Sequence, residues 1–199
     1  MITISTVFEW VNICDISDGD IRHCEELMPE ERRARIERFR LIDDRRRSVI
    51  GELLARRLIA GRCGIPFDAI VFGRTERGKP FAVGLPAEFS ISHSGEFVLC
   101  AVSDSPVGAD IEKIRPVRDR LIQRVCSDRE LDFVWKKGIS DDEMYSRFFQ
   151  VWTGKEAYLK YLGTGIGVTK LKEFSILDDE ICRRMTFFLS EGYAVSIFQ

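Results

Sequence analysis

The chain has 199 residues, of which 45% are hydrophobic and 31% are charged, and its formal net charge is −2. These values are ordinary for a water-soluble globular protein with a substantial core, and the charge argues against nucleic-acid binding driven by bulk positive charge. No apolar run approaches the roughly 20 residues of a membrane span. Because the six cysteines form no C-x-x-C pair and the N-terminus lacks a secretory pattern, we expect a reduced, cytoplasmic protein without structural zinc.

The first half of the chain predicts strands and two helices. Apolar alternation predicts a strand over residues 3–10, and a proline followed by two glutamates predicts a helix from Pro29 to about residue 39. A stronger helix is predicted over residues 43–60, where apolar residues recur at helical spacing and Gly61 and Gly64 stand at the expected end. Strands are then expected over residues 69–72, 88–92 and 97–102.

The second half begins after a short break at residues 104–106, and a strand is predicted over residues 107–112. Ser127 and Ser140 are each followed three residues later by a glutamate, which is the spacing of a capping box. They predict one helix that ends at Gly138 and a longer helix that runs to residue 162 and is closed by Gly163. Strands are predicted over residues 173–177, 185–189 and 193–198.

The two halves share an order of elements, because each has a long amphipathic helix followed by about three strands. We therefore expect an α+β fold made of two similar lobes, residues 1–105 and residues 106–199. A cleft between two lobes of one chain needs no second subunit, so we expect a monomer.

The clearest chemical signal is a pair of acids on the strand predicted over residues 107–112. Residues two apart in a strand face the same side, so Asp110 and Glu112 project together while Ile111 faces away. Two carboxylates on one face repel each other unless a cation lies between them, and Mg²⁺ prefers such oxygen ligands. The alternative for this short pattern is a solvated strand face, neutralised locally by Lys113 and Arg115.

A third acid, Glu156, continues the apolar row of the long second-half helix. That row consists of Met144, Phe148, Trp152 and Leu159. Glu156 therefore lies on or beside the inward-facing stripe, where a lone carboxylate is costly to bury. A metal shared with Asp110 and Glu112 would compensate for that cost. The alternative is a surface ion pair between Glu156 and Lys160, one helical turn apart.

Three other segments suit an anionic ligand. Nine arginines between Arg32 and Arg56 provide a basic surface. Ser92 and His93 offer hydroxyl, imidazole and backbone N–H donors, and the alternative for them is ordinary hairpin-turn chemistry. Gly78-Lys79-Pro80 is a rigid turn with a lysine at its tip, for which the alternative is a solvated loop. No Gly-rich phosphate loop and no G-x-S-x-G motif occurs, so phosphate binding would come from scattered groups.

Taken in order, four segments resemble the 4′-phosphopantetheinyl transferases of the surfactin-synthetase-activating (Sfp) type. They are Gly78-Lys79-Pro80, FSISHS at residues 89–94, VGADIE at residues 107–112 and WTGKEAYLK at residues 152–160. The resemblance covers roughly residues 30–177, and it implies two α+β lobes related by a pseudo-twofold, with coenzyme A in the cleft between them. It also implies Mg²⁺-dependent transfer of the phosphopantetheine arm of coenzyme A to a serine of an apo acyl or peptidyl carrier protein, which releases adenosine 3′,5′-bisphosphate.

The resemblance further implies roles for individual residues. It gives Asp110, Glu112 and Glu156 as Mg²⁺ ligands, Glu156 as the base for the carrier serine, and Glu156, Lys160 and His93 as the catalytic set. The residues that it places near coenzyme A are Arg35, Arg38, Arg47, Gly78, Lys79, Pro80, Ser92, His93 and Lys160. The chain departs from the family pattern at Ser90, where many members have asparagine, and at Ala109, where isoleucine or valine is usual.

Two other functions are compatible with the same residues. One is a different Mg²⁺-dependent phosphoryl or nucleotidyl transferase that uses the three acids on another donor. The other is a coenzyme A- or carrier-binding module without turnover, which the loss of an acid would favour, whereas all three acids are present. The carrier itself is left open among fatty-acid, polyketide and peptide-synthetase carriers.

Overall fold

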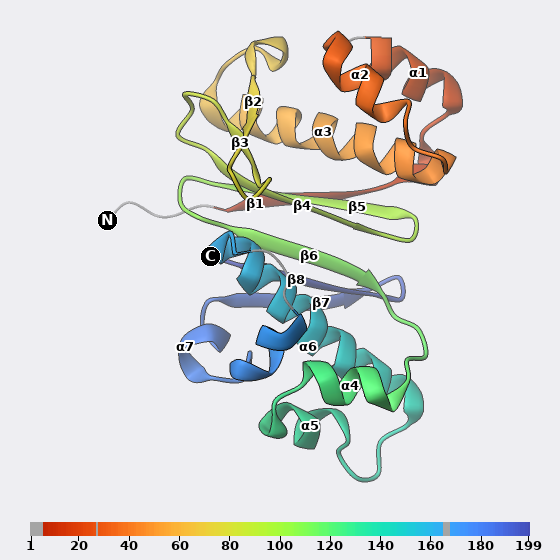
Figure 1. The fold of residues 1–199 in the computed structure, drawn as a ribbon, viewed down its shortest axis with the longest axis vertical. Helices are drawn as coiled ribbons and strands as arrows, with labels where there is room; N and C mark the ends of the chain where they lie inside the picture. The colour runs from red at the N-terminus through yellow and green to blue at the C-terminus, as the bar shows by residue number, and fades with distance from the viewer. Residues whose placement is uncertain (1–5, 27, 165–167) are drawn as a thin grey trace.

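The structure is a computed structural model that describes residues 6–26, 28–164 and 168–199 (Figure 1). The first half contains β1 (Val7–Asn12), η1 (Ile13–Asp15), α1 (Asp18–Glu26), α2 (Glu30–Ile36), α3 (Ile42–Cys63), η2 (Phe67–Ala69), β2 (Phe72–Arg74), β3 (Pro80–Ala82), β4 (Glu88–Ser94) and β5 (Phe97–Ser103). The second half contains β6 (Gly108–Lys113), α4 (Asp119–Val125), α5 (Asp128–Val134), α6 (Asp141–Leu162), η3 (Val168–Glu173), α7 (Asp179–Cys182), β7 (Met185–Ser190) and β8 (Tyr193–Phe198). The expected α+β class is therefore confirmed.

Helix α3 covers one face of an antiparallel sheet in the first half of the chain. The sheet has the strand order β1-β5-β4, and β2 and β3 form a separate two-stranded hairpin. The helix approaches closely at Gly51, where an added Cβ would lie 3.1 Å from the side chain of Ile91. Leu54 and Ala55 of α3 are buried in one cluster with Phe89 and Cys100 of the sheet. Burial of this apolar face holds the helix on the sheet.

Helix α6 covers one face of a second antiparallel sheet, whose strand order is β6-β8-β7. Gly108 at the start of β6 permits this contact, because a Cβ there would overlap the carbonyl oxygen of Ala157 and lie 2.5 Å from the backbone nitrogen of Tyr161. The aromatic and aliphatic row of α6 is buried against this sheet and the neighbouring helices, and includes Phe148, Val151 and Leu159.

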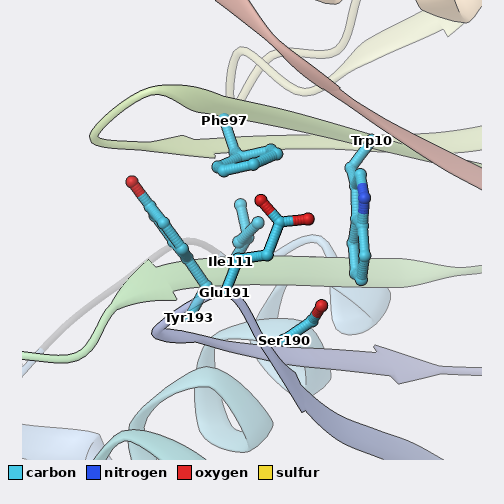
Figure 2. Close-up of a pocket in the computed structure, with 6 residues that line it drawn as sticks. All are labelled: Trp10, Phe97, Ile111, Ser190, Glu191 and Tyr193. Carbon is cyan, nitrogen blue, oxygen red and sulfur yellow. The ribbon is translucent and has the colours of Figure 1, made fainter.

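The two sheets face each other, so the layers run from α3 through the first sheet and the second sheet to α6 (Figure 1). The apolar layer between the sheets includes Leu99 and Ala101 of β5, Ile111 of β6, and Val195 and Ile197 of β8. At one end of this layer, side chains from β1, β5, β6 and the β7–β8 hairpin surround a small pocket (Figure 2). The core is thus continuous from one half of the chain to the other.

Most predicted elements are confirmed, with shifted ends. The long helices end at Gly64 and Gly163, which both adopt left-handed backbone with φ 65°, as a C-cap glycine should. Gly61, in contrast, lies inside α3 and does not end it. The strand predicted over residues 3–10 is found as β1 from Val7, and residues 3–5 lie outside the described residues.

Two predicted strands are wrong. In the segment at residues 69–72, Ala69 ends η2, residues 70 and 71 are irregular, and only Phe72 belongs to a strand, β2. The carbonyl of Ile70 accepts from Nη1 of Arg56 at 2.6 Å and not from a partner strand. The segment at residues 173–177 is irregular beyond η3, and buried side chains hold its backbone. Glu130 Oε1 accepts from the amide of Ile176 at 2.8 Å, and the Lys155 ammonium donates to the carbonyl of Phe174 at 2.6 Å.

The helix expected to end at Gly138 stops at Val134, and the short helices α1, α4 and α7 were not predicted. These helices have four to nine residues, too few for an apolar period to stand out. Within the three described ranges, no helix combines the length and the apolar character that crossing a membrane requires.

Candidate active site

The alternation of β6 sends its two acids to one side of the strand. Asp110 is only 4% exposed and Glu112 is partly buried, while Ile111 faces the opposite side and lines the small pocket of Figure 2. The predicted parity of the strand is therefore confirmed. Asp110 and Glu112 are not a solvated strand face, because both carboxylates have lost most of their contact with bulk water.

Asp110 is held by groups from both halves of the chain. Its Oδ1 accepts from the Ser92 hydroxyl of β4 at 2.6 Å and from the Lys160 ammonium of α6 at 2.7 Å. Its other oxygen, Oδ2, is buried and has no hydrogen-bond partner. A buried carboxylate oxygen without a partner costs free energy, so it is a coordination position that a cation would satisfy.

Glu112 is held less tightly than Asp110. Its Oε2 accepts from the Ser94 hydroxyl at 2.7 Å and, at 3.5 Å, from Nη1 of the exposed Arg115. Burial and the nearby charge of Asp110 raise the pKa of Glu112, although the hydrogen bond from Ser94 opposes that shift. The carboxylate is therefore short of positive charge.

Glu156 faces the same acids from α6, as the helical row predicted. The residue is 4% exposed, and its Oε1 is buried without a hydrogen-bond partner. Burial, followed by the charge of Asp110, raises the pKa of Glu156 to about 7. The surface ion pair considered for Glu156 is absent from the described contacts, because the Lys160 ammonium donates to Asp110 and to the carbonyl of Ala109 instead.

The three acids do not form a closed metal site. Among the residues that the structure describes, no three His, Cys, Asp or Glu side chains are grouped as metal ligands. Two of the three acids nevertheless carry a buried oxygen without a partner, and two have raised pKa values. Carboxylate oxygens whose negative charge is not balanced by a nearby cation are suitable ligands for a hard cation such as Mg²⁺.

A cavity of about 830 Å³, a size that suits a nucleotide, is lined by residues of α2, α3, the β2–β3 hairpin and β4, and none of the three acids lines it. Of the predicted ligand residues, Arg35, Arg47, Pro80 and His93 line it. His93 stands at its rim, where partial burial and the charges of Arg47 and Lys160 lower the pKa of the imidazole. His93 faces the opposite side of β4 from Ser92. The link between the cavity rim and the acids is Lys160, whose charge acts on His93 and whose ammonium donates to Asp110.

Three arginines converge in this cavity, and two of them were not predicted as site residues. Burial and the positive charges of Arg35 and Arg32 lower the pKa of Arg74. Like charges repel each other unless an anion lies between them, so this arrangement favours an anionic ligand. The sequence could have indicated Arg32, because it lies three residues before Arg35 on α2 and therefore on the same side of the helix. Arg74 gives no such signal, since only the fold brings the β2–β3 hairpin to α2.

The floor of the cavity adds a buried ion-pair network. Glu52 accepts from Arg56 Nη2 at 2.9 Å and also from Nε of Arg32, and Arg56 lies 4.9 Å from the ring centre of Phe72. Glu52 thus neutralises part of the cationic charge and fixes two guanidinium groups. The cavity lining stays net positive, because it also includes Arg35, Arg47 and Arg74.

Three other residues predicted to contact the ligand, Gly78, Lys79 and Arg38, do not line the cavity. Lys79 donates to the carbonyl of Lys160 at the end of α6 at 3.0 Å, and burial lowers the pKa of its ammonium. Gly78 occupies the hairpin turn with φ 83°. Arg38 is exposed and is not among the residues that line the cavity. The roles of Lys79, Gly78 and Arg38 toward a ligand stay predictions.

Comparison with known proteins agrees with this site. A family model described as "4'-phosphopantetheinyl transferase, N-terminal" matches residues 16–105, and one described as "4'-phosphopantetheinyl transferase superfamily" matches residues 106–198. A 4′-phosphopantetheinyl transferase of Bacillus subtilis is 33% identical over 162 residues, which are 81% of this chain and 71% of that protein. The chain belongs to the 4′-phosphopantetheinyl transferase superfamily.

Two further relatives of this superfamily are more similar but longer. The 4′-phosphopantetheinyl transferase psf-1 of Bacillus pumilus is 38% identical over 149 residues, or 73% of this chain and 63% of psf-1. The transferase gsp of Aneurinibacillus migulanus is 36% identical over 137 residues, or 69% of this chain and 56% of gsp. The chain thus spans less than two thirds of the length of these two relatives. The resemblance to the Sfp type is confirmed.

Proposed function

We propose that this protein transfers the 4′-phosphopantetheine arm of coenzyme A to a serine of an apo acyl or peptidyl carrier protein. The observation that supports the proposal is a cluster of three acids, two with an unpartnered buried oxygen, which Lys160 links to His93 at the rim of a cavity lined by several arginines. Coenzyme A consists of a 3′-phosphorylated nucleoside joined through a pyrophosphate to a neutral arm, and its charge and size suit this cavity.

Asp110, Glu112 and Glu156 would hold Mg²⁺ through their carboxylate oxygens. When bound, Mg²⁺ would neutralise the pyrophosphate and stabilise the charge that develops during transfer. Glu156 would also accept the proton of the carrier serine, directly or through water. Burial raises the pKa of Glu156 to about 7 without metal, and a bound cation would lower that pKa, so Glu156 would be a weaker base while it holds Mg²⁺.

The bond changes balance without a further reactant. The serine oxygen forms a bond to the phosphorus that carries the pantetheine arm. The bond from that phosphorus to the adjacent bridging oxygen breaks, the electron pair stays on that oxygen, and adenosine 3′,5′-bisphosphate leaves. Lys160 would shift from Asp110 toward the phosphates and offset their charge, with His93 as a further donor.

The arginines of the cavity would bind the nucleotide end of coenzyme A. Arg35 and Arg74 lie close enough to influence each other and are the strongest candidates for the 3′-phosphate. Arg32 also lines the cavity, but it is already committed to Glu52 and Ser48. Arg47 is already committed to the carbonyl of Gly95 at 2.6 Å and to Asp44 at 2.6 Å, so it would serve more as a rim charge than as a phosphate clamp.

We also propose that residues 1–105 and 106–199 are two lobes related by a pseudo-twofold, in a monomer. The strand orders β1-β5-β4 and β6-β8-β7 are equivalent, since in each half the first strand pairs with the last. Each half also has a 22-residue helix, capped by a left-handed glycine, against its sheet. This repetition supports a common plan for the two halves.

The test is incubation of the protein with coenzyme A, Mg²⁺ and a panel of apo carriers, followed by intact-mass measurement of each carrier. A phosphopantetheine adduct on at least one carrier is expected, and Glu156→Gln should abolish it. A folded protein that modifies no carrier would refute the proposal. It would then favour the phosphoryl transferase with another donor, or the binding module without turnover.

A further inference from the structure

Three serines alternate along β4 and all reach β6 of the other sheet. Ser90, Ser92 and Ser94 are two residues apart, so they share one face of the strand. The Ser90 hydroxyl accepts from the amide of Ala109 at 2.9 Å, and the Ser92 hydroxyl donates to Asp110 at 2.6 Å. We call Ser90, Ser92 and Ser94 the serine ladder. It joins two sheets that do not pair through their backbones.

Ser90 and Ser94 make different contacts with β6. Ser90 is buried, and the described contacts of its hydroxyl are with the backbone of Ala109 in β6. Ser94 is partly buried and divides its hydroxyl between two groups. It accepts from the amide of Lys113 at 3.1 Å and donates to Oε2 of Glu112 at 2.7 Å. Ser94 therefore ties a site carboxylate to the strand that carries it.

The turn next to Ser94 is anchored from both halves of the chain. Glu96 accepts from the Lys113 ammonium at 3.0 Å and from the Tyr193 hydroxyl, which itself accepts from the amide of Glu96 at 3.1 Å. Gly95 occupies the tight turn with φ 53°, and a Cβ there would run into the Tyr193 hydroxyl. Arg47 donates to the carbonyl of Gly95 at 2.6 Å. The Ser94 hydroxyl is thus presented from a fixed backbone.

Glu112 depends on this hydroxyl. Its only other described side-chain partner is Arg115, at 3.5 Å and largely exposed, and such a contact holds a carboxylate weakly. Without Ser94 the Glu112 side chain would regain several rotamers, which a metal would have to restrict on binding. Groups that orient a ligand carboxylate from behind affect metal affinity strongly.

We infer that Ser94 is a positioning residue that presets the Glu112 carboxylate for the divalent cation, whereas Ser90 only fastens the two sheets together. The inference rests on the proposed function for the cation and its site. It adds a residue that contacts neither the reacting atoms nor the ligand cavity. Within the serine ladder, Ser94 thus serves the metal site and Ser90 serves the fold.

The test compares Ser94→Ala with its matched control Ser90→Ala in the full chain. Mn²⁺ binding is followed by electron paramagnetic resonance, with the metal alone and again with coenzyme A, and thermal unfolding is measured without metal. We expect Ser94→Ala to weaken Mn²⁺ binding about tenfold with a melting temperature close to wild type. Ser90→Ala should lower the melting temperature, because it leaves the buried amide N–H of Ala109 without its hydrogen-bond acceptor. It should leave the Mn²⁺ affinity unchanged.

Transfer kinetics give a second readout. Ser94→Ala should raise the Mg²⁺ concentration for half-maximal rate while leaving kcat at saturating Mg²⁺ near that of wild type. Wild-type metal affinity in Ser94→Ala, or a drop in melting temperature as large as that of Ser90→Ala, would overturn the inference and leave the transferase proposal standing. A wild-type protein that transfers phosphopantetheine without binding Mn²⁺ or Mg²⁺ would also overturn it. If the wild type binds the metal, Ser94→Ala weakens that binding, and no phosphopantetheine is transferred, then only the proposed function is contradicted.

Discussion

Replacing Glu156 by glutamine should stabilise the metal-free protein at alkaline pH, although it should abolish transfer. The carboxylate is 4% exposed, one of its oxygens has no partner, and it faces the charges of Asp110 and Glu112. Burial raises its pKa from 4.5 to about 7. An acid with a raised pKa favours the folded state below its unfolded value, and this contribution is lost as pH rises through the folded value.

The size of the effect follows from that shift. Each pKa unit corresponds to about 1.4 kcal/mol, so ionised Glu156 lowers the free energy of unfolding by about 3 kcal/mol at pH 8 relative to a neutral side chain. Glutamine keeps the shape and carries no charge. The advantage of Glu156→Gln should therefore be near its full size at pH 7 to 8, shrink as the pH falls from about 7 to 4.5, and vanish below about pH 4.5, where Glu156 is neutral in both the folded and the unfolded wild type.

Urea unfolding of both proteins in EDTA, at a series of pH values from about 4 to 8, measures this difference. Mg²⁺ supplies a matched condition, because it should stabilise the wild type at pH 8 and stabilise the variant less. A variant that is equal to or less stable than wild type at pH 8 in EDTA would refute the assignment of Glu156 as a buried, unpaired acid. A constant difference across the pH series would refute its cause, since only ionisation explains a pH-dependent gap.

Three further changes test other parts of the structure. Gly61→Ala should raise the free energy of unfolding by about 1 kcal/mol, since Gly61 lies inside α3 with open space around it, whereas Gly108→Ala should lower it sharply because its Cβ would overlap the backbone of α6; urea denaturation distinguishes these opposite signs. Lys155→Met should destabilise by about 3–5 kcal/mol, because Glu130 would remain buried without its cation at 2.7 Å, and a double variant with Glu130→Gln should recover part of that loss in the same assay. Arg74→Ala should raise the KM for coenzyme A about tenfold with little change in the KM for the carrier, which steady-state kinetics would measure, and equal effects on both constants would contradict its place in the nucleotide cavity.

The site acids were predictable because periodicity alone decides on which side a side chain lies. Asp110 and Glu112 share a strand face by parity, and Glu156 continues an apolar helical row, so the spacing indicated all three without knowledge of the fold. Capping residues likewise fixed the start of α6 at Ser140, whose hydroxyl accepts from the amide of Glu143 at 3.2 Å.

Other parts of the molecule depend on contacts between distant segments, which local patterns do not contain. Arg74 joins the cavity only because the β2–β3 hairpin packs near α2. Residues 173–177 have the composition of a strand, but Lys155 and Glu130 take up the backbone groups of Phe174 and Ile176. Ser94 looks like a turn residue in sequence, and its bond to Glu112 exists because two separate sheets meet there. In each case tertiary contacts override a local preference.

The central claim is tested most directly by counting both products of one reaction. Coenzyme A, Mg²⁺ and an apo carrier are incubated with the protein, and the modified carrier and the released adenosine 3′,5′-bisphosphate are quantified together. The account predicts one bisphosphate for each phosphopantetheine added to the carrier serine, and neither product when that serine is replaced by alanine. Release of the bisphosphate without modified carrier, or modification of the alanine carrier, would contradict it.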